Sequence, residues 1–442
     1  MGALVILGNG AAGTATAMGF RQYNRRDPVY LISRESELLF SRPGLVGVAL
    51  GQTLPQDLHP LPPAHFDQAG IVRLHSPAVE VQPAARRVRL ESGVELAYDH
   101  LVLALGRVPR ALDFSLSAEA EREVLRLHGW GDGPRLAAQR GRRWGVVGGG
   151  WIGAELAEIA SFRGERVHWW MRNSHPGAPW VTPEEGAALV RHHLPPNIAV
   201  HGDFRLLEVS RTAGHWSLRG RDEAGQECTY EVDVFAAGIG VVPDFTSWRH
   251  LLGPDAAGVL LGNDGIRVTR ALGAALPGVW AVGDCVDAEA WSGGLLRSWE
   301  MAQRMGLHLG QGLAQDQVTD FVPGVQAMDA RLFRKTFAQW GDGREPAAPG
   351  EEQTGTVSGW LDVRQLFGVR FHWNAQGALA GVATWDWRLK SEAVKRAISL
   401  GYDRERCAAE WKQWSHEPAF RNRPWNAATA ALRGSEIIFK ND

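Results

Sequence analysis

The stretches GNGAAG (8–13) and GGGWIGAE (148–155) decide the fold, because both carry the pattern G-x-G-x-x-G in the same context. Each follows an apolar run, ALVILG at 3–8 and RWGVVG at 143–148, and each opens a helix-like run that leads to a second strand-like run. One such pattern is weak evidence. Two of them in a strand–turn–helix setting predict two phosphate-binding βαβ units, with a pyrophosphate at each helix N-terminus.

The rest of the sequence predicts an α/β chain with three parts. We expect a discontinuous first dinucleotide domain at 1–110 and 242–324, and a second one at 111–241. From about residue 325, alternating strand-like runs and one helix indicate a separate C-terminal α+β domain, 325–442. Its tail, rich in Trp, Pro and Arg from residue 410, is expected to be an arm packed on the body.

Composition excludes several classes of protein. The chain has 442 residues, 45% of them hydrophobic, and a net charge of −2, which indicates neither a nucleic-acid binder nor a polybasic membrane anchor. No apolar run approaches the roughly 20 residues of a transmembrane helix. Cys228, Cys285 and Cys407 lie far apart, without CxxC spacing, so we expect a reducing compartment, the cytoplasm. We expect no metal site, because the neighbouring His192 and His193 would point apart on a helix.

Five motifs in a fixed order resemble one family. They are GNGAAG, YDHLVLALG, GGGWIGAE, AAGIGVVPD and VWAVGDC, and they lie within roughly residues 1–320. The chain resembles the pyridine nucleotide–disulfide oxidoreductase superfamily, in particular its branch without a redox disulfide: rubredoxin and ferredoxin reductases, the flavin part of nitrite reductases, and apoptosis-inducing-factor-like proteins. The resemblance implies a glutathione-reductase-like fold with two Rossmann-like domains and a C-terminal α+β interface domain.

The resemblance implies that the first fold binds FAD. Glu35 is the expected ribose ligand, although Arg34 could instead pack on the adenine and Glu35 could be a solvated turn residue. Asp284, at the end of a buried strand, is expected to accept hydrogen bonds from ribityl hydroxyls, and a helix N-cap is the alternative. The residues assigned to FAD are Gly8, Gly10, Ala11, Ala12, Gly13, Arg34, Glu35, Arg42, Pro43, Ala104, Gly106, Gly283, Asp284 and Trp299.

The second fold is expected to bind NADPH or NADH. Glu155 is the expected catalytic residue near the nicotinamide, or else an exposed first-turn acid favoured by the helix dipole. Arg172 ends the second strand and no acid follows before Glu184, which favours the 2′-phosphate of NADPH, with NADH left open. The residues assigned to this nucleotide are Gly148, Gly150, Trp151, Ile152, Gly153, Arg172 and Gly238.

The segment FSRPGL (40–45) contains no cysteine, and Gly47 lies where ferredoxin reductases carry a lysine. We therefore expect hydride to pass from NAD(P)H to FAD, and electrons to leave for an external acceptor, a small iron–sulfur or rubredoxin-type protein. Two alternatives remain open: an oxidase or quinone reductase, and a redox-sensing interaction protein like apoptosis-inducing factor. The chain could be a monomer or a homodimer.

Overall fold

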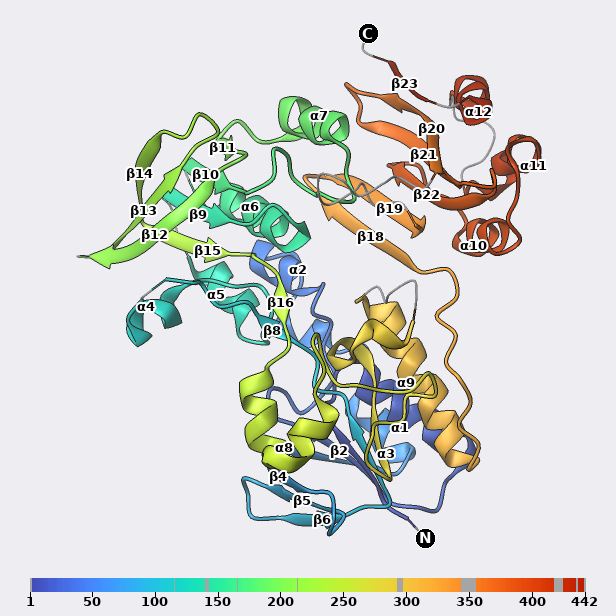
Figure 1. The fold of residues 1–442 in the computed structure, drawn as a ribbon. Coiled ribbons are helices and arrows are strands. Elements are labelled where there is room, and N and C mark those ends of the chain that lie inside the picture. Colours follow the sequence, from blue (N-terminus) through green and yellow to red (C-terminus); the bar gives the residue numbers. More distant parts are fainter. Residues whose placement is uncertain are drawn as a thin grey trace. The chain divides into compact units, whose positions relative to one another are not determined.

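The structure is a computed structural model that describes the whole chain except residues 1, 115, 140–142, 165, 213, 292–296, 343–354, 417–423, 435 and 441–442. The chain forms two compact units (Figure 1). The first unit contains residues 1–110, 128–134 and 241–323, and the second contains 111–127, 135–240 and 324–442. The division into three domains made from the sequence stays a prediction.

The first unit is built on a parallel sheet in the order β17-β7-β1-β2-β3. Its strands are β1 (Leu4–Leu7), β2 (Val29–Ser33), β3 (Ile71–His75), β7 (His100–Leu103) and β17 (Val279–Ala281). Strand β1 pairs with β2 on one side and β7 on the other, so the strand order reverses beside β1. Ligands of doubly wound sheets bind outside the carboxyl ends of the strands at such a switch point.

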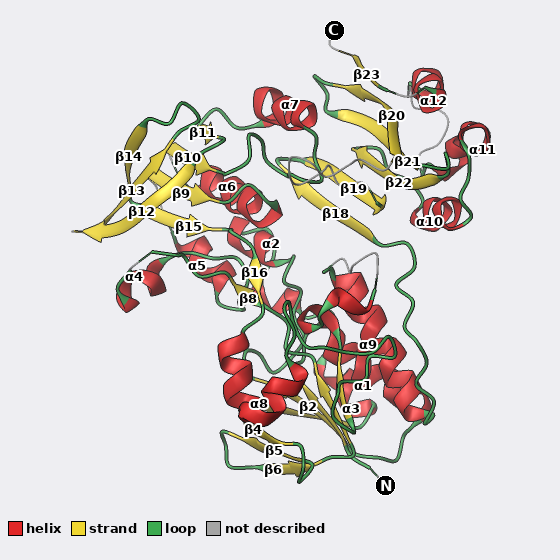
Figure 2. Ribbon diagram, viewed as in Figure 1, coloured by secondary structure: helices red, strands yellow, loops and turns green. Residues whose placement is uncertain are grey.

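Two helices of the first unit meet at backbone distance. They are α1 (Ala11–Tyr23) and α9 (Trp299–Ala314), which lie side by side in Figure 2. A Cβ on Gly306 would lie 2.1 Å from the Ala12 carbonyl oxygen, and one on Gly310 would lie 2.2 Å from that of Thr16. The two glycines therefore allow α9 to press on α1 and hold both helix N-termini beside the end of β1.

Smaller elements complete the first unit. An antiparallel sheet contains β4 (Ala78–Gln82), β5 (Arg87–Leu90) and β6 (Glu95–Ala97), and a two-stranded sheet contains β8 (Val108–Pro109) and β16 (Val241–Val242). The helices are α2 (Leu45–Leu50), α3 (Pro63–Gln68) and α8 (Phe245–Leu260). Tyr98, Leu96 and Val81 bring the antiparallel sheet into the core of this unit.

The second unit repeats the parallel arrangement in the order β11-β10-β9-β15. These strands are β9 (Arg143–Val147), β10 (Arg166–Trp170), β11 (Ile198–His201) and β15 (Val234–Ala237), with helices α6 (Trp151–Arg163) and α7 (Pro183–His193). An antiparallel sheet of β12 (Arg205–Thr212), β13 (His215–Arg221) and β14 (Glu227–Val232) packs on it through an apolar cluster that includes Trp170, Trp216 and Phe235. Helix α4 (Ala118–Glu123) precedes β9, and helix α5 (Asp132–Ala138) begins in the first unit and ends in the second.

The second unit also contains a six-stranded sheet in the order β18-β19-β22-β21-β20-β23. Its elements are β18 (Ala327–Leu332), β19 (Lys335–Gly341), β20 (Gly355–Asp362), β21 (Phe367–Asn374), β22 (Leu379–Trp385), α10 (Ser391–Ser399), α11 (Arg404–Glu410), α12 (Trp425–Arg433) and β23 (Ile437–Lys440). Strand β23 follows the tail for which an arm was expected, and it pairs with β20 in parallel at the edge of the sheet. Trp411 and Trp425 pack with Trp387 in the core that these helices cover, so the tryptophans serve packing.

Candidate functional site

Gly8, Gly10 and Gly13 form the first glycine loop, between β1 and α1. A Cβ on Gly8, whose φ is +110°, would lie 2.1 Å from the Ala104 carbonyl oxygen, and one on Gly13 would lie 1.8 Å from that of Gly8. Gly10 differs, because a Cβ there would meet nothing within 4 Å. The outer glycines thus allow the chain to close on itself, and the middle one leaves open space at the N-terminus of α1. A pyrophosphate fits this opening, since helix N-termini bind anions.

The second glycine loop lies between β9 and α6 and consists of Gly148, Gly150 and Gly153. As in the first loop, the outer glycines are closely packed and the middle one has open space. Gly148 has φ +125°, and a Cβ on it would clash with the Gly238 carbonyl. A Cβ on Gly153 would clash with the Gly148 carbonyl. Gly150 is exposed and has open space at its Cβ position. Gly238, predicted as a ligand residue, lies against Gly153, so its small size lets β15 approach the loop. The second loop therefore offers a second phosphate site.

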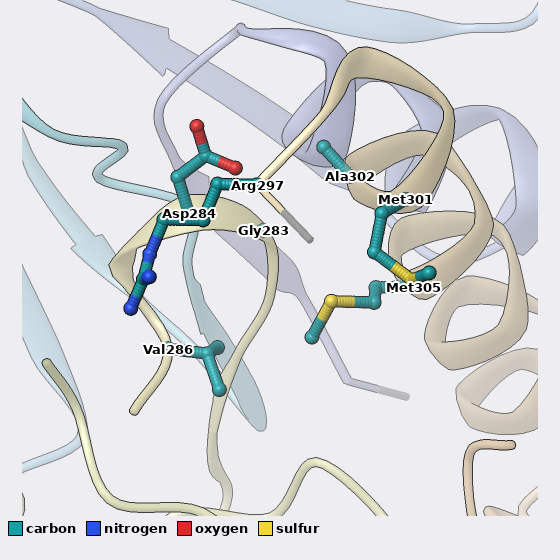
Figure 3. Close-up of a pocket in the computed structure, with 7 residues that line it drawn as sticks. All are labelled: Gly283, Asp284, Val286, Arg297, Met301, Ala302 and Met305. Carbon is teal, nitrogen blue, oxygen red and sulfur yellow. The ribbon is translucent and has the colours of Figure 1, made fainter. Parts of the chain in front are cut away.

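Asp284 lies just after β17, in a small pocket of the first unit. The pocket is lined by Gly283, Asp284, Val286, Arg297, Met301, Ala302 and Met305, and Figure 3 shows Met301 and Met305 on α9, across from the Gly283–Asp284 turn. Burial raises the pKa of Asp284, and the charges of Arg297, Arg107 and Arg42 oppose this rise. Among the described residues none donates a hydrogen bond to its carboxylate, so the carboxylate is available for a ligand's hydroxyl groups. The alternative role of Asp284, a helix N-cap, would need a backbone N–H bonded to this carboxylate, and no described residue provides one.

Gly283 ties this turn to the first glycine loop. Its φ is +79°, and a Cβ on it would lie 2.7 Å from the Cβ of Ala12, the second residue of α1. Asp284 therefore lies beside the N-terminus of α1, where a dinucleotide bound at Gly10 would extend. Ala11 and Ala12, both predicted site residues, have small side chains that allow this approach. These residues together fit the FAD that the sequence predicts.

Arg107 is a residue of this site that the sequence did not reveal. Its side chain is only 5% exposed and pairs with Asp264 at 2.9 Å, and its Nε donates to the Asp284 backbone carbonyl at 2.9 Å. Arg297 pairs with the same Asp264. The buried guanidinium thus holds the backbone of the turn that carries the Asp284 carboxylate. The only local signal was its place directly after Gly106, at the end of the predicted strand.

Glu35 and Arg42 are brought together, as a pair, near the carboxyl end of β2. Arg42 donates to Glu35 Oε2 at 2.8 Å and to the His128 carbonyl, and the Trp130 N–H donates to Glu35 Oε1 at 2.7 Å. The ring of Trp130 stacks on His59 with centroids 4.9 Å apart. The segment at 128–134 therefore packs beside the position expected for the adenosine of FAD, and Trp130 was not among the predicted residues.

The remaining residues predicted for FAD lie around the same sheet edge with fewer contacts. Ala104 and Gly106 follow β7, and Trp299 begins α9, capped by the hydroxyl of Ser298. Arg34 and Pro43 are exposed. No described residue forms an ion pair or hydrogen bond with the side chain of Arg34. The choice between Arg34 and Glu35 for the adenosine stays a prediction, and the contacts of Glu35 favour Glu35 as the ordered group.

Glu155 lies in the second turn of α6, after the second glycine loop. Burial and the neighbouring Glu158 raise its pKa to about 7. No described residue donates a hydrogen bond to its carboxylate, whereas Glu158 accepts the Phe333 N–H at 3.3 Å. Glu155 is thus not the exposed first-turn acid of the alternative interpretation. A partly buried carboxyl group that titrates near neutral pH can exchange a proton with a neighbouring ligand.

Arg172, Trp151 and Ile152 lie around the second glycine loop. Arg172 follows β10, is exposed, and has no described ion-pair partner, so its charge is available to a ligand. Trp151 is partly buried, and its ring lies 5.3 Å from that of Phe337 on β19. Trp151 is thus held by the six-stranded sheet, a contact that sequence reasoning did not anticipate. Ile152 is partly buried on the first turn of α6.

The cysteines offer no redox centre in the described structure. All three are described and free. Cys285 is fully buried, donates to the Val282 carbonyl at 3.2 Å, and has a pKa raised by burial to about 11. In the described part of the chain no group of three His, Cys, Asp or Glu side chains could hold a metal, and no described helix is long and apolar enough to cross a membrane.

Comparison with known proteins agrees with this geometry. The family profile described as pyridine nucleotide-disulphide oxidoreductase matches residues 2–306. The chain belongs to this family. It is 28% identical over 327 residues to the ferredoxin–NAD⁺ reductase component of the p-cumate 2,3-dioxygenase system of Pseudomonas putida, covering 71% of this chain and 75% of that protein. It is also 28% identical to the rubredoxin–NAD⁺ reductase of Ectopseudomonas oleovorans, covering 65% and 72%.

A solved structure extends the likeness to the fold. A ferredoxin reductase from Rhodopseudomonas palustris matches with a TM-score of 0.73 at 24% identity, over 87% of this chain and 91% of that one. The predicted fold class and the resemblance are therefore confirmed. As a pyridine nucleotide-disulphide oxidoreductase, the chain is an oxidoreductase that uses FAD and a nicotinamide nucleotide.

Proposed function

We propose that this protein is an FAD-dependent NAD(P)H reductase that passes electrons to a separate small iron–sulfur or rubredoxin-type protein. The observation that carries the proposal is the pair of glycine loops, each with an open middle glycine at a helix N-terminus, in a chain whose described cysteines form no redox pair. The curated relatives support it, because their names assign them ferredoxin or rubredoxin as partners.

The residues of the first unit would hold FAD and shape its surroundings. The open backbone at Gly10 would receive the pyrophosphate, Glu35 the ribose of the adenosine, and the partnerless carboxylate of Asp284 the ribityl hydroxyls. Bound FAD supplies the redox chemistry: it accepts hydride and returns electrons singly. The chain contributes orientation and charge, and the charges of Arg297, Arg107 and Arg42 favour the ionised form of Asp284.

The second fold would hold the nicotinamide nucleotide. Gly150 would receive its pyrophosphate, and Glu155 would lie on the nicotinamide side of α6. Arg172 has no described carboxylate partner and favours a 2′-phosphate, whereas the names of the relatives print NAD⁺. We retain NADPH as the nucleotide favoured by Arg172, with NADH as the competitor that the relatives favour. Comparing kcat/KM for the two nucleotides decides between them.

The acceptor would lie outside this chain. Cys285 points into the core, and its raised pKa of about 11 keeps it a thiol near neutral pH, so it is a poor nucleophile. Cys228 lies on β14 and Cys407 is buried on α11. The electron acceptor would therefore have to come from outside this chain. We further propose that the protein works in a reducing compartment, the cytoplasm, as a monomer or homodimer.

The test is a steady-state comparison of acceptors with both nucleotides. We expect turnover with a ferredoxin or a rubredoxin to exceed turnover with dioxygen, quinones or disulfides, at two acceptor molecules per nucleotide oxidised. Fast dioxygen or quinone reduction without a protein partner would replace this proposal by the oxidase or quinone-reductase alternative. A long-lived reduced complex with little turnover would favour the redox-sensing alternative.

A further inference from the structure

The loop at 172–181, which leaves the carboxyl end of β10, folds back over the second glycine loop. The Gly177 N–H donates a 2.7 Å hydrogen bond to the Gly149 carbonyl, between the first two glycines of the pattern. A Cβ on Gly177 would lie 3.6 Å from the ring of Trp151. Because nucleotides bind outside the carboxyl ends of parallel strands, this loop borders the expected nucleotide site.

The loop contains turns and bends and no helix or strand. His175 Nε2 lies 2.8 Å from the Val181 carbonyl oxygen, which closes the loop on itself. The His175 ring packs against Gly186 of α7, where an added Cβ would lie 2.5 Å from the His175 Cβ. The loop begins at Arg172 and ends at Val181, directly before Thr182, the N-cap residue of α7.

Arg370, on β21 of the six-stranded sheet, reaches that end. Its side chain is only 2% exposed, and Nη2 donates to the Trp180 carbonyl at 2.7 Å while Nη1 donates to Glu185 Oε2 at 3.1 Å. Nε donates to His372 Nε2 at 3.1 Å. Burial lowers the pKa of His372 well below its usual range, so the ring is neutral and can accept this bond.

Glu185 connects the same guanidinium to the start of α7. Its carboxylate accepts the Thr182 N–H at 3.0 Å, and its own N–H donates to the Thr182 hydroxyl at 3.3 Å, which completes a capping box. One arginine therefore fixes both the last residues of the loop and the helix that follows it. A planar guanidinium can bond three partners in different directions, which a lysine ammonium on a flexible stem does not reproduce.

We propose that Arg370 is a positioning residue for the nicotinamide nucleotide: through the Trp180 carbonyl and Glu185, it holds the loop at 172–181 in the shape that the nucleotide needs. The C-terminal sheet thus sets nucleotide affinity from a position more than 180 residues away in sequence. The inference rests on the proposed function, because it takes the second glycine loop as the nucleotide site.

The test uses Arg370→Lys in the full-length protein with FAD bound. Lysine keeps a positive charge beside Glu185 but loses the second guanidinium hydrogen bond, the one to the Trp180 carbonyl. We expect the Kd values for NAD⁺ and NADP⁺, measured by calorimetric titration, to rise about tenfold. We expect KM for the reduced nucleotide to rise in parallel, while kcat, FAD content and the visible spectrum of the bound flavin stay unchanged.

Arg404→Lys is the matched control. Arg404 lies in the same domain, donates to the Leu432 carbonyl at 3.1 Å and to Thr356 Oγ1 at 2.7 Å, and stacks on Trp373, so its described partners lie outside the loop. We expect its nucleotide Kd to match that of the unsubstituted protein. An equal rise in both variants would show general loosening of the domain and overturn the inference.

A second variant covers the case in which Arg370→Lys does not fold. Arg370→Met combined with Glu185→Met replaces a buried ion pair by apolar side chains, an exchange that folded proteins often tolerate. This variant also releases the Trp180 carbonyl, and the same rise in Kd is expected. An unchanged Kd in either folded variant contradicts the inference. If the unsubstituted protein binds no nicotinamide nucleotide, the proposed function itself fails.

Discussion

Arg42 donates a 2.8 Å hydrogen bond to Glu35, and both side chains remain partly exposed beside the carboxyl end of β2. The pair orders the segment FSRPGL (40–45), which contains no cysteine. The other carboxylate oxygen of Glu35 accepts a hydrogen bond from the Trp130 N–H, so the carboxylate is held from two sides. An ordered acid at this place fits a ribose hydroxyl, because charge-assisted bonds give both strength and direction.

Replacing Glu35 by alanine should therefore weaken FAD binding. The variant loses the ribose contact and frees Arg42 and the Trp130 N–H, so we expect the Kd for FAD to rise about tenfold or more. Flavin fluorescence during titration of the FAD-free protein measures this Kd. Glu37→Ala is the control, since Glu37 is 62% exposed and its only ion-pair partner in the described structure is Arg73. Equal effects in both variants would count against a ligand role for Glu35.

The first glycine loop predicts opposite outcomes at two positions. In Gly10→Ala the new methyl group has open space, so the FAD-free protein should keep its thermal stability and lose FAD affinity. In Gly13→Ala the methyl group would meet the Gly8 carbonyl at 1.8 Å, and overpacking should lower the free energy of unfolding by about 1–3 kcal/mol or more. Calorimetric melting and FAD titration distinguish the two. A Gly10→Ala protein with undiminished FAD affinity would place the pyrophosphate elsewhere.

The same argument gives a control in the second fold. Gly150→Ala should weaken nicotinamide nucleotide binding and leave the FAD content unchanged, because Gly150 belongs to the other unit and has open space at its Cβ position. Loss of FAD from Gly150→Ala would contradict the assignment of the two loops to two different nucleotides.

Asp284→Asn tests the carboxylate beside the N-terminus of α1. Burial raises the pKa of Asp284 and no described side chain satisfies its oxygens, so the FAD-free variant should be at least as stable as the unsubstituted protein. FAD should bind more weakly by about tenfold to a hundredfold, the loss of one charge-assisted hydrogen bond. Asp287→Asn is the comparison, because Asp287 caps Glu289 and Asp264 and its loss should lower stability instead. A destabilised Asp284→Asn protein would indicate a structural N-cap.

Glu155 predicts a pH dependence with a definite sign. Its pKa in the folded protein is about 7, above the ordinary 4.5. Between pH 4.5 and pH 7, Glu155 therefore keeps its proton in the folded protein but has lost it in the unfolded chain. The free energy of unfolding therefore falls as pH rises through this window. Glu155→Gln should remove this fall and be more stable than the unsubstituted protein at pH 8, by on the order of 2 kcal/mol, with little difference at pH 4.

Denaturant unfolding at several pH values measures this effect. Glu184→Gln is the control, since Glu184 is exposed on the first turn of α7. Parallel stability curves for Glu155→Gln and the unsubstituted protein would show that Glu155 does not titrate near pH 7. In that case a role for this group in proton exchange at the nicotinamide would lose its basis.

The parts of the fold with local signals were predictable. The two glycine patterns, the strands before them and the strand before Asp284 each depend on spacing within a short segment, and the structure places them as expected. Arg107 and Trp130 were missed, because Arg107 reaches Asp284 across 177 residues and Trp130 reaches Glu35 across 95. Such contacts depend on the tertiary fold, and a side chain's own neighbours in sequence do not reveal them. Strand β23 was missed for the same reason, since its partner β20 lies far upstream.

The most direct test of the account is anaerobic mixing of the FAD-loaded protein with NADPH or NADH. The visible absorbance of the flavin should bleach, and it should return when an oxidised ferredoxin or rubredoxin is added, with two acceptor molecules reduced per nucleotide. A protein that binds no FAD, or whose flavin is reduced but reoxidised only by dioxygen, quinone or disulfide, would contradict the central claim that its electrons leave for a separate redox protein.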